Sequence, residues 1–156
     1  RSAFRLIKSL EERQRTIYKV ARSIVSFQRD FLDHGIERMK PLVLKDVAEE
    51  IGMHESTVSR VVNNKYMHTH RGLFEMRFFF HSGIASTQGG ENVSSLTVKD
   101  RIRKIVGAED SRRPLSDAAI VAVLRSEGLQ IARRTVAKYR EELRIPASSS
   151  RKASFR

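Results

Sequence analysis

The feature that most constrains the fold is the absence of glycine and proline from residues 3–34. Apolar side chains recur in this stretch at spacings of three, four or seven residues, which places them along one side of an α-helix. These residues are Leu6, Leu10, Ile17, Val20, Ile24, Phe27 and Phe31. Gly35 is a natural helix stop. The pattern predicts one helix over residues 1–35, about 30 residues and roughly 45 Å long at 1.5 Å per residue.

One turn of this helix, from Glu11 to Thr16, is polar on every side. A helix that is polar on all sides either crosses solvent between two domains or binds another molecule. The simpler interpretation is a helix that packs on its own domain and exposes this one turn to solvent. Both interpretations stay open at this point.

Residues 36–82 predict a second module built on two short helices. Leu44, Val47, Ala48 and Ile51 share one apolar face, and Gly52 then breaks the helix. A small residue four positions before a turn glycine lets a second helix cross closely, as in the helix-turn-helix of bacterial DNA-binding proteins. The alternative is a plain helical hairpin packed on the long helix.

On the second helix of this module, Val58 and Val61 are predicted to face inward. The short polar side chains and the one arginine then face outward, where they can contact phosphates and base edges. The candidate DNA-binding residues of the module are Ser56, Thr57, Ser59, Arg60 and Asn63. The aromatic stretch of residues 73–80 that follows suits a short core element better than a surface that stacks on unpaired bases.

The glycine-containing residues 83–93 predict a flexible linker. Residues 94–146 predict three helices: one capped by Thr97 with Asp100, one capped by Ser116 or Asp117, and one from Ala132 to about Arg144. The second and third of these make another helix-turn-helix. We expect residues 147–156, which are rich in serine and basic residues, to form a disordered tail. The predicted fold class is therefore all-α.

The last predicted helix has two chemically distinct sides. Ala132, Val136, Tyr139 and Leu143 fall on one side and suit a core. The residues of the helix that could face DNA are Arg133, Arg134, Thr135, Ala137, Lys138 and Glu141. Arginine at the start of a helix in the major groove can bind guanine O6 and N7 with two hydrogen bonds.

The charge of the chain agrees with a polyanionic partner. The net charge is +12, and each predicted module is basic: residues 1–82 carry 15 basic and 10 acidic side chains, and residues 94–146 carry 12 and 7. There are no cysteines, which excludes disulfides and thiolate metal sites and fits a cytosolic protein. His68 and His70 lack an obvious third metal ligand nearby in the sequence, so we expect surface histidines. No catalytic motif or cofactor-binding motif stands out, and we expect no enzyme, no cofactor and no metal.

Residues 132–141, Ala-Arg-Arg-Thr-Val-Ala-Lys-Tyr-Arg-Glu, resemble the RpoN box of the sigma-54 family of bacterial sigma factors. Residues 44–60, 65–69, 78–80 and 89–91 also look familial. The resemblance implies that residues 94–146 form an RpoN-box domain reading the −24 promoter element, whose guanines suit Arg133 and Arg134. It also implies that the upstream helix-turn-helix lies toward the −12 element, with Arg60 the most favoured contact there.

Partners follow from the same resemblance: promoter DNA directly, and RNA polymerase core and an ATP-dependent activator through the full-length protein, in the bacterial cytoplasm at the nucleoid. We expect the chain to be a fragment, without the family's glutamine-rich activator-responsive region and its main polymerase-binding domain, and we expect no membrane association. Elements at −24 and −12 lie about one duplex turn, roughly 34 Å, apart. Two other classes stay open: a helical module that docks on polymerase or a regulator, and a nonspecific nucleic-acid binder.

Overall fold

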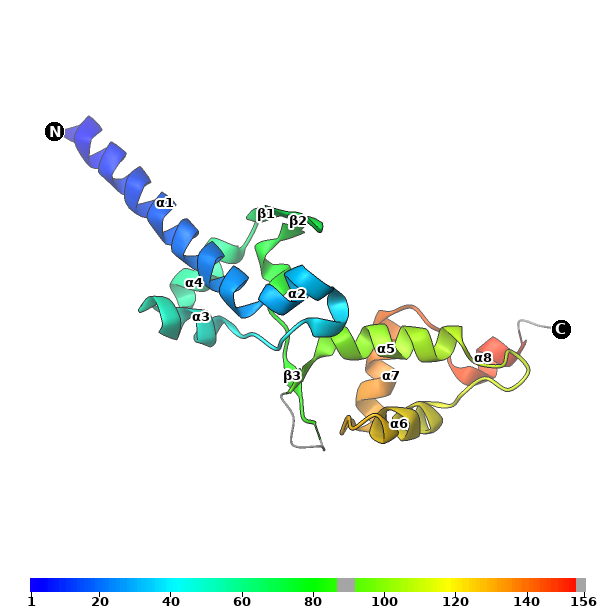
Figure 1. Ribbon diagram of the computed structural model, residues 1–156. Helices are drawn as coiled ribbons and strands as arrows, with labels where there is room; N and C mark the ends of the chain where they lie inside the picture. Colours follow the sequence, from blue (N-terminus) through cyan, green and yellow to red (C-terminus); the bar gives the residue numbers. More distant parts are fainter. Residues whose placement is uncertain (87–91, 154–156) are drawn as a thin grey trace. The chain divides into compact units, whose positions relative to one another are not determined.

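The computed structural model describes residues 1–86 and 92–153, in two units, Arg1–Ser82 and Gly83–Arg156 (Figure 1). Both units are mostly helical, as predicted. Each also contains one short antiparallel strand pair, which the all-α prediction omitted. The strands are only two to four residues long, too short to show the alternation of polar and apolar residues that reveals a strand in a sequence.

The first 34 residues form two helices, α1 (Ser2–Phe27) and α2 (Arg29–His34), so the prediction of one unbroken helix is wrong at Gln28. The Gln28 side chain is fully buried. Its Nε2 donates to the carbonyl oxygens of Lys40 (2.8 Å) and Phe79 (2.9 Å), and its Oε1 accepts from the Lys40 N–H (3.0 Å). The chain leaves helical geometry where this amide is anchored to two other segments, and a short 3-10 helix, η1 (Ile36–Arg38), follows α2.

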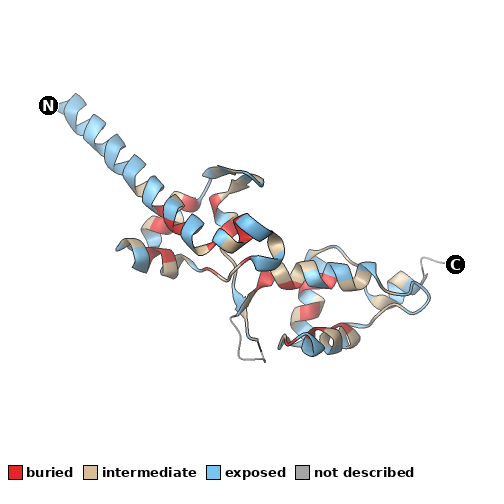
Figure 2. Ribbon diagram, viewed as in Figure 1, coloured by how far each residue is buried: buried red, intermediate tan, exposed pale blue. Residues whose placement is uncertain are grey.

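Only the C-terminal half of α1 contributes to the core of the first unit. Val20 and Ile24 are fully buried, whereas Leu6 and Leu10 are 64% and 52% exposed. The N-terminal half of α1 extends away from the rest of this unit and is exposed along its length (Figure 2). The apolar stripe predicted along the whole helix is thus buried at one end only.

Two short helices, α3 (Leu44–Ile51) and α4 (Glu55–Val62), pack on each other and on α1. Gly52 ends α3 with a left-handed backbone (φ 67°), and the Met53 N–H bonds the Ala48 carbonyl (3.0 Å), as the turn prediction requires. The buried valines of α4 are Val58 and Val62, not Val58 and Val61. Val62 lies one full turn after Val58, while Val61 lines a pocket beside α1.

A hairpin of β1 (Tyr66–Thr69) and β2 (Gly72–Glu75) follows α4 and leads into a 3-10 helix, η2 (Met76–Phe79). Met76 and Phe79 are buried. The rings of Phe74 and Phe78 stack with centroids 4.9 Å apart, and Phe31 of α2 meets Phe79 edge-on at 5.9 Å. The aromatic stretch is therefore a core element, as predicted.

The second unit begins inside the predicted linker. Strands β3 (Gly83–Ile84) and β4 (Val93–Ser94) pair in antiparallel register, and Ile84 and Val93 pack against the core of this unit. The two ends of residues 83–93 are therefore ordered parts of the second unit. The glycine pair on which the prediction of flexibility depended lies outside the described residues.

Three helices form the body of the second unit: α5 (Ser95–Gly107), α6 (Asp117–Ser126) and α7 (Arg133–Glu142). Ser94, not Thr97, caps α5, because its Oγ accepts the Thr97 N–H (3.1 Å). The Ser116 side chain caps α6 by accepting a hydrogen bond from the Ala119 N–H. Of the two predicted caps, Ser116 and Asp117, the first is therefore confirmed. The buried core residues are Val98, Ile102, Ile120, Leu124, Ile131, Val136 and Tyr139.

The prediction of a disordered tail from Ala147 is wrong over its first part, because Ser148–Ala153 form helix α8. Arg151 holds this helix in place. Its Nε and Nη2 donate to the Glu109 carboxylate (2.6 and 2.9 Å), and Nη2 also donates to the Leu115 carbonyl (2.8 Å). A serine-rich, basic composition does not reveal that one arginine has a buried carboxylate as its partner.

Candidate nucleic-acid interface

Helix α7 separates an apolar side from a charged side. Val136 and Tyr139 are buried against α5 and α6, and Leu143 packs on the same core. Ala132, which we placed on the inward side, is exposed because it is the N-cap and lies outside the helix. The predicted DNA-facing residues Arg133, Arg134, Lys138 and Glu141 are exposed, and Thr135 and Ala137 are half-buried.

The first turn of α7 carries two adjacent arginines. Arg133 and Arg134 form no ion pair with any residue that the structure describes, and they line a hollow with Asp117, Ala132 and Ala137. Alanine at the N-cap offers no side-chain acceptor, so the first N–H groups of α7 keep their capacity to bind an anion. Two arginines without an ion-pair partner among the described residues and the N-cap of α7 thus line the same hollow.

The last turn of α7 is partly neutralised. Glu142 accepts from Lys99 (2.5 Å) and lies 3.9 Å from Lys138. The hydrogen bond from Lys99 lowers the pKa of Glu142 below its ordinary value, against a smaller opposing effect of desolvation. Lys138 therefore shares a carboxylate, whereas the arginines of the first turn do not.

Arg140 is the residue of this helix that the sequence analysis missed. It belongs to the decapeptide but is buried, with 8% of its side chain exposed, and its Nε donates to Asp117 Oδ1 (2.8 Å). It therefore attaches α7 to the first turn of α6 and does not face solvent. The only sequence signal was its place one residue after Tyr139, at the edge of the inward face.

The candidate DNA-binding residues on and next to helix α4 differ in how far they are exposed to solvent. Ser56 and Arg60 are exposed, and Thr57 and Ser59 are half-buried. Asn63 is exposed but follows the helix as its C-cap, and its Oδ1 accepts a hydrogen bond from Arg77 (3.0 Å). Arg60 forms no ion pair with the described part of the chain, so it is the free cation on this face.

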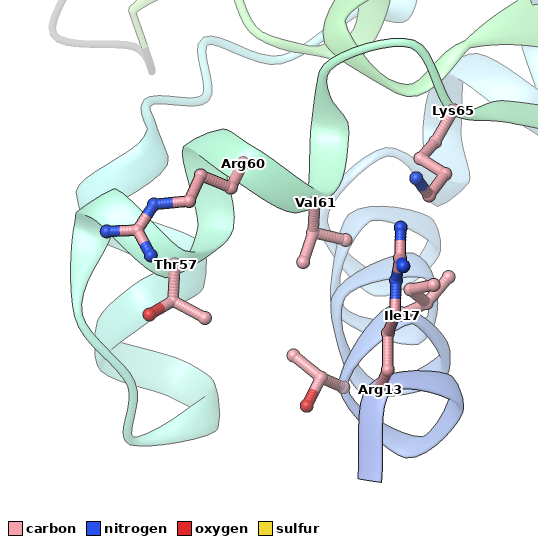
Figure 3. Close-up of a pocket in the computed structure, with 7 residues that line it drawn as sticks. Arg13, Ile17, Thr57, Arg60, Val61 and Lys65 are labelled. Atoms are coloured by element: carbon pink, nitrogen blue, oxygen red, sulfur yellow. The ribbon is translucent and has the colours of Figure 1, made fainter. Parts of the chain in front are cut away.

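A pocket of about 310 Å³ lies between α4 and α1 (Figure 3). Its lining residues are Arg13, Thr16, Ile17, Thr57, Arg60, Val61 and Lys65. Two of the predicted DNA-facing residues, Thr57 and Arg60, thus share a concave surface with two cations that the sequence analysis did not single out. The signal that could have identified Arg13 was its position in the all-polar turn of the long helix.

Among the residues that the structure describes, the histidines do not form a metal site. His68 lies on β1, and His70 Nε2 lies 2.6 Å from the Leu32 carbonyl oxygen. Across residues 1–86 and 92–153 no group of three or more histidine, cysteine, aspartate or glutamate side chains could hold a metal ion. No helix in those ranges is long and apolar enough to cross a membrane.

Each of the two helical units exposes at least one arginine on a short helix, a feature that DNA-binding proteins present to nucleic acid. The model of a family described as "Sigma-54, DNA binding domain" matches residues 1–153. The chain belongs to this sigma-54 DNA-binding family.

Known relatives agree with this family. The chain is 56% identical over 146 residues to an RNA polymerase sigma-54 factor of Pseudomonas putida and 57% identical over 146 residues to one of Acinetobacter guillouiae. These alignments cover 94% of this chain but only 29% and 30% of the relatives, so the chain spans less than a third of their length. The structure resembles that of Aquifex aeolicus sigmaN bound to promoter DNA, with a TM-score of 0.65 and 44% identity, over 96% of this chain and 46% of that one.

Proposed function

We propose that this chain is the promoter-DNA-binding part of a bacterial sigma-54 transcription initiation factor. Helix α7 reads the −24 element, and helix α4 faces the −12 region. The observation that carries the proposal is the pair of exposed, unpaired arginines at the start of α7, backed by buried Val136 and Tyr139. The family and the DNA-bound Aquifex aeolicus relative support the same assignment.

Each unit holds its proposed DNA helix in a helix-turn-helix. In the first unit α3 supports α4 across the turn at Gly52, and in the second α6 supports α7 across residues 127–132. In such motifs the second helix enters the major groove and its first residues contact base edges. By this proposal, Arg133 and Arg134 contact the bases of the −24 element.

The side chains of α7 explain how this helix would recognise bases. A guanidinium group donates two parallel hydrogen bonds to guanine O6 and N7, and no other base presents this pair of acceptors in the major groove. Thr135, Ala137, Lys138 and Glu141 complete the surface that faces the groove. Arg60, with Ser56, Thr57, Ser59 and Asn63 around it, supplies phosphate and base contacts near −12.

The chain binds DNA rather than catalysing a reaction, and it acts within a longer protein. RNA polymerase core and an ATP-dependent activator are partners of that whole protein, in the bacterial cytoplasm. Two DNA-binding units on one chain raise the effective concentration of the second contact once the first has formed.

Fluorescence anisotropy tests the proposal. We compare a duplex carrying the −24 and −12 elements with the same duplex after replacement of the −24 guanines, at several salt concentrations. We expect a large loss on guanine replacement that persists as salt rises. Arg133→Ala and Arg134→Ala each cost about 1–3 kcal/mol on the cognate duplex and much less on random DNA.

Arg125→Ala is the matched control, because Arg125 is an exposed arginine of the same unit that lies on α6. It should leave the preference for the −24 guanines intact. Equal affinities for all duplexes, falling together with salt, would leave a nonspecific basic binder. Weak DNA binding with tight binding to polymerase core would favour an interaction module.

A further inference from the structure

We propose that Ser82 is the whole connector between the two DNA-reading units, and that its length of one residue determines which spacing between the −24 and −12 elements the chain accepts. This inference rests on the proposed function, since it takes both units as DNA readers. It assigns specificity to a length of backbone and not to a side chain that contacts a base. The observations that carry it are the backbone contacts on either side of Ser82.

The chain is anchored to the first unit as far as His81. The Gln28 Nε2 donates to the Phe79 carbonyl (2.9 Å), and both residues are fully buried. Two residues later the His81 N–H donates to the Leu42 carbonyl, and the Leu42 N–H donates to the His81 carbonyl, each over 3.0 Å. Leu42 is itself buried. The first unit therefore holds the backbone in place up to His81.

The chain is anchored again at Gly83, the first residue of the second unit. Gly83 pairs with Ser94 across β3 and β4. Ser94 is fully buried, and its side chain caps α5. The Ala85 carbonyl accepts the Gln130 N–H (3.2 Å), which ties the residues after β3 to the turn that precedes α7. The second unit therefore holds the backbone from Gly83 onward.

Ser82 alone lies between these two anchored stretches. It is exposed and belongs to no helix or strand. Residues 83–93, which the composition predicted as the linker, begin and end within the second unit, because β3 pairs with β4. Since consecutive Cα atoms are about 3.8 Å apart, the Cα atoms of His81 and Gly83 stay within about 7.6 Å of each other in any conformation of Ser82. The connector can turn, but it cannot lengthen.

Such a short connector makes binding sensitive to the spacing of the two DNA elements. Once each unit has docked on its own element, His81 is fixed relative to the −12 element and Gly83 relative to the −24 element. One base pair more or less moves a docked unit by about 3.4 Å along the duplex axis and about 35° around it.

For a residue that lies outside the duplex, this translation and rotation together amount to several ångströms. That displacement is comparable to the full reach of the connector. Units on wrongly spaced elements therefore cannot both stay docked, and the affinity gained by linking two binding units is lost.

The test lengthens the connector in the chain of residues 1–156. One variant carries Gly-Ser-Gly-Ser inserted between Ser82 and Gly83. The matched control carries the same insertion between Gly89 and Gly90, within the second unit. A connector of five residues reaches up to roughly 20 Å, which absorbs a shift of one base pair. Fluorescence anisotropy at constant salt gives the affinity of each chain for three duplexes: the natural spacing, one base pair added and one base pair removed.

The wild-type chain should bind the two altered duplexes about 100-fold more weakly than the natural one. The connector insertion should reduce this penalty to about threefold or less. It should also weaken binding to the natural duplex by about tenfold, because effective concentration falls roughly as the −3/2 power of connector length. A shorter insertion of Gly-Ser at the same place should give an intermediate penalty. The control insertion should keep the wild-type penalty.

All the chains should bind a duplex with the −24 element alone equally well, which checks that the second unit stays folded. A full spacing penalty in the connector insertion would overturn the inference. So would an equal relaxation by the control insertion, since that result places the free length within residues 83–93. A wild-type chain that binds all three spacings equally would also overturn it. A wild-type chain without preference for the −24 guanines at natural spacing refutes the promoter function, a failure distinct from these.

Discussion

The Arg140 Nε donates to Asp117 Oδ1 over 2.8 Å and joins the proposed DNA-reading helix α7 to the first turn of α6. A second guanidinium nitrogen of Arg140 donates to the Ile145 carbonyl (2.8 Å), beyond the end of α7. The side chains are only 8% and 20% exposed. One arginine thus fixes both the partner helix and the C-terminal end of α7, while Arg133 and Arg134 of the same helix stay free.

Arg140→Ala should lower the free energy of unfolding of the second unit by about 3 kcal/mol, because it leaves the Asp117 carboxylate partly buried without its cation. Urea unfolding followed by circular dichroism measures the change. Arg133→Ala is the matched control and should stay within about 0.5 kcal/mol of wild type, since its side chain is exposed. Arg140→Lys should recover only part of the loss, because an ammonium cannot make the forked contact.

A double-mutant cycle with Asp117→Ala separates the pair from other effects of the arginine. A coupling energy near zero would show that Arg140 stabilises the unit through packing alone. Arg140→Ala should also weaken binding to the cognate duplex more than to random DNA, since it loosens the helix that carries the proposed base contacts of Arg133 and Arg134. An equal loss on both duplexes would contradict the positioning role.

Glu109 should make the attachment of α8 sensitive to acid. Burial alone raises the pKa of Glu109, but hydrogen bonds from Arg151 and the Leu115 N–H, together with the charge of Arg151, bring the pKa below its ordinary value of 4.5. The contribution to stability is therefore complete above about pH 4.5. It is lost as pH falls from there through the lower folded-state pKa, because the unfolded chain takes up the proton first.

Glu109→Gln should cost about 1–3 kcal/mol at pH 7, and the difference from wild type should shrink as pH falls below the ordinary pKa. Urea unfolding between pH 7 and pH 3 measures both effects. Glu11→Gln removes the same charge from an exposed site on α1 and should change little at any pH. A constant difference between wild type and Glu109→Gln across this range would contradict the proposed ion pair.

Patterns that repeat over several turns were predictable from the sequence. The spacing of Val136 and Tyr139 oriented α7 correctly, and Gly52 marked the end of α3, because a helical face and a left-handed turn each leave a local signature. The two inward valines of α4 were predicted less well. A helix of eight residues has only about two inward positions. The second of these could be Val61 or Val62, and because both are valine the sequence does not distinguish them.

Long-range polar contacts were not predictable. Gln28 bonds Lys40 and Phe79, and Arg151 bonds Glu109, across 12, 51 and 42 residues. A buried glutamine or arginine has the same sequence signature as a surface one, since its partner is set by tertiary packing. The pocket beside α4 could not be predicted for the same reason: Arg13 and Lys65 line one pocket only after α1 packs on α4.

Gln28→Ala should lower the free energy of unfolding of the first unit by about 2–3 kcal/mol, because it leaves the N–H and carbonyl of Lys40 and the carbonyl of Phe79 without this partner. Thermal and urea unfolding measure the loss. Gln14→Ala is the matched control, since Gln14 is an exposed glutamine of α1 and its loss should be near zero. Equal small effects of the two substitutions would mean that the buried amide is dispensable.

Arg144→Gly should stabilise the second unit by about 0.5–1 kcal/mol. Helix α7 ends in a Schellman motif, in which the Arg144 N–H bonds the Glu141 carbonyl (2.8 Å) and the Ile145 N–H bonds the Arg140 carbonyl (3.0 Å). This motif places Arg144 in the left-handed region with φ 57°, where a Cβ is strained and glycine is not.

Arg144→Ala separates backbone strain from charge, because it removes the guanidinium and keeps the Cβ. We expect no gain from alanine and a higher urea midpoint from glycine, at unchanged m-value. A gain of equal size from both substitutions would assign the effect to the lost positive charge in this basic unit. A loss from glycine would show that the entropy it adds to the unfolded chain outweighs the strain it relieves at the end of α7.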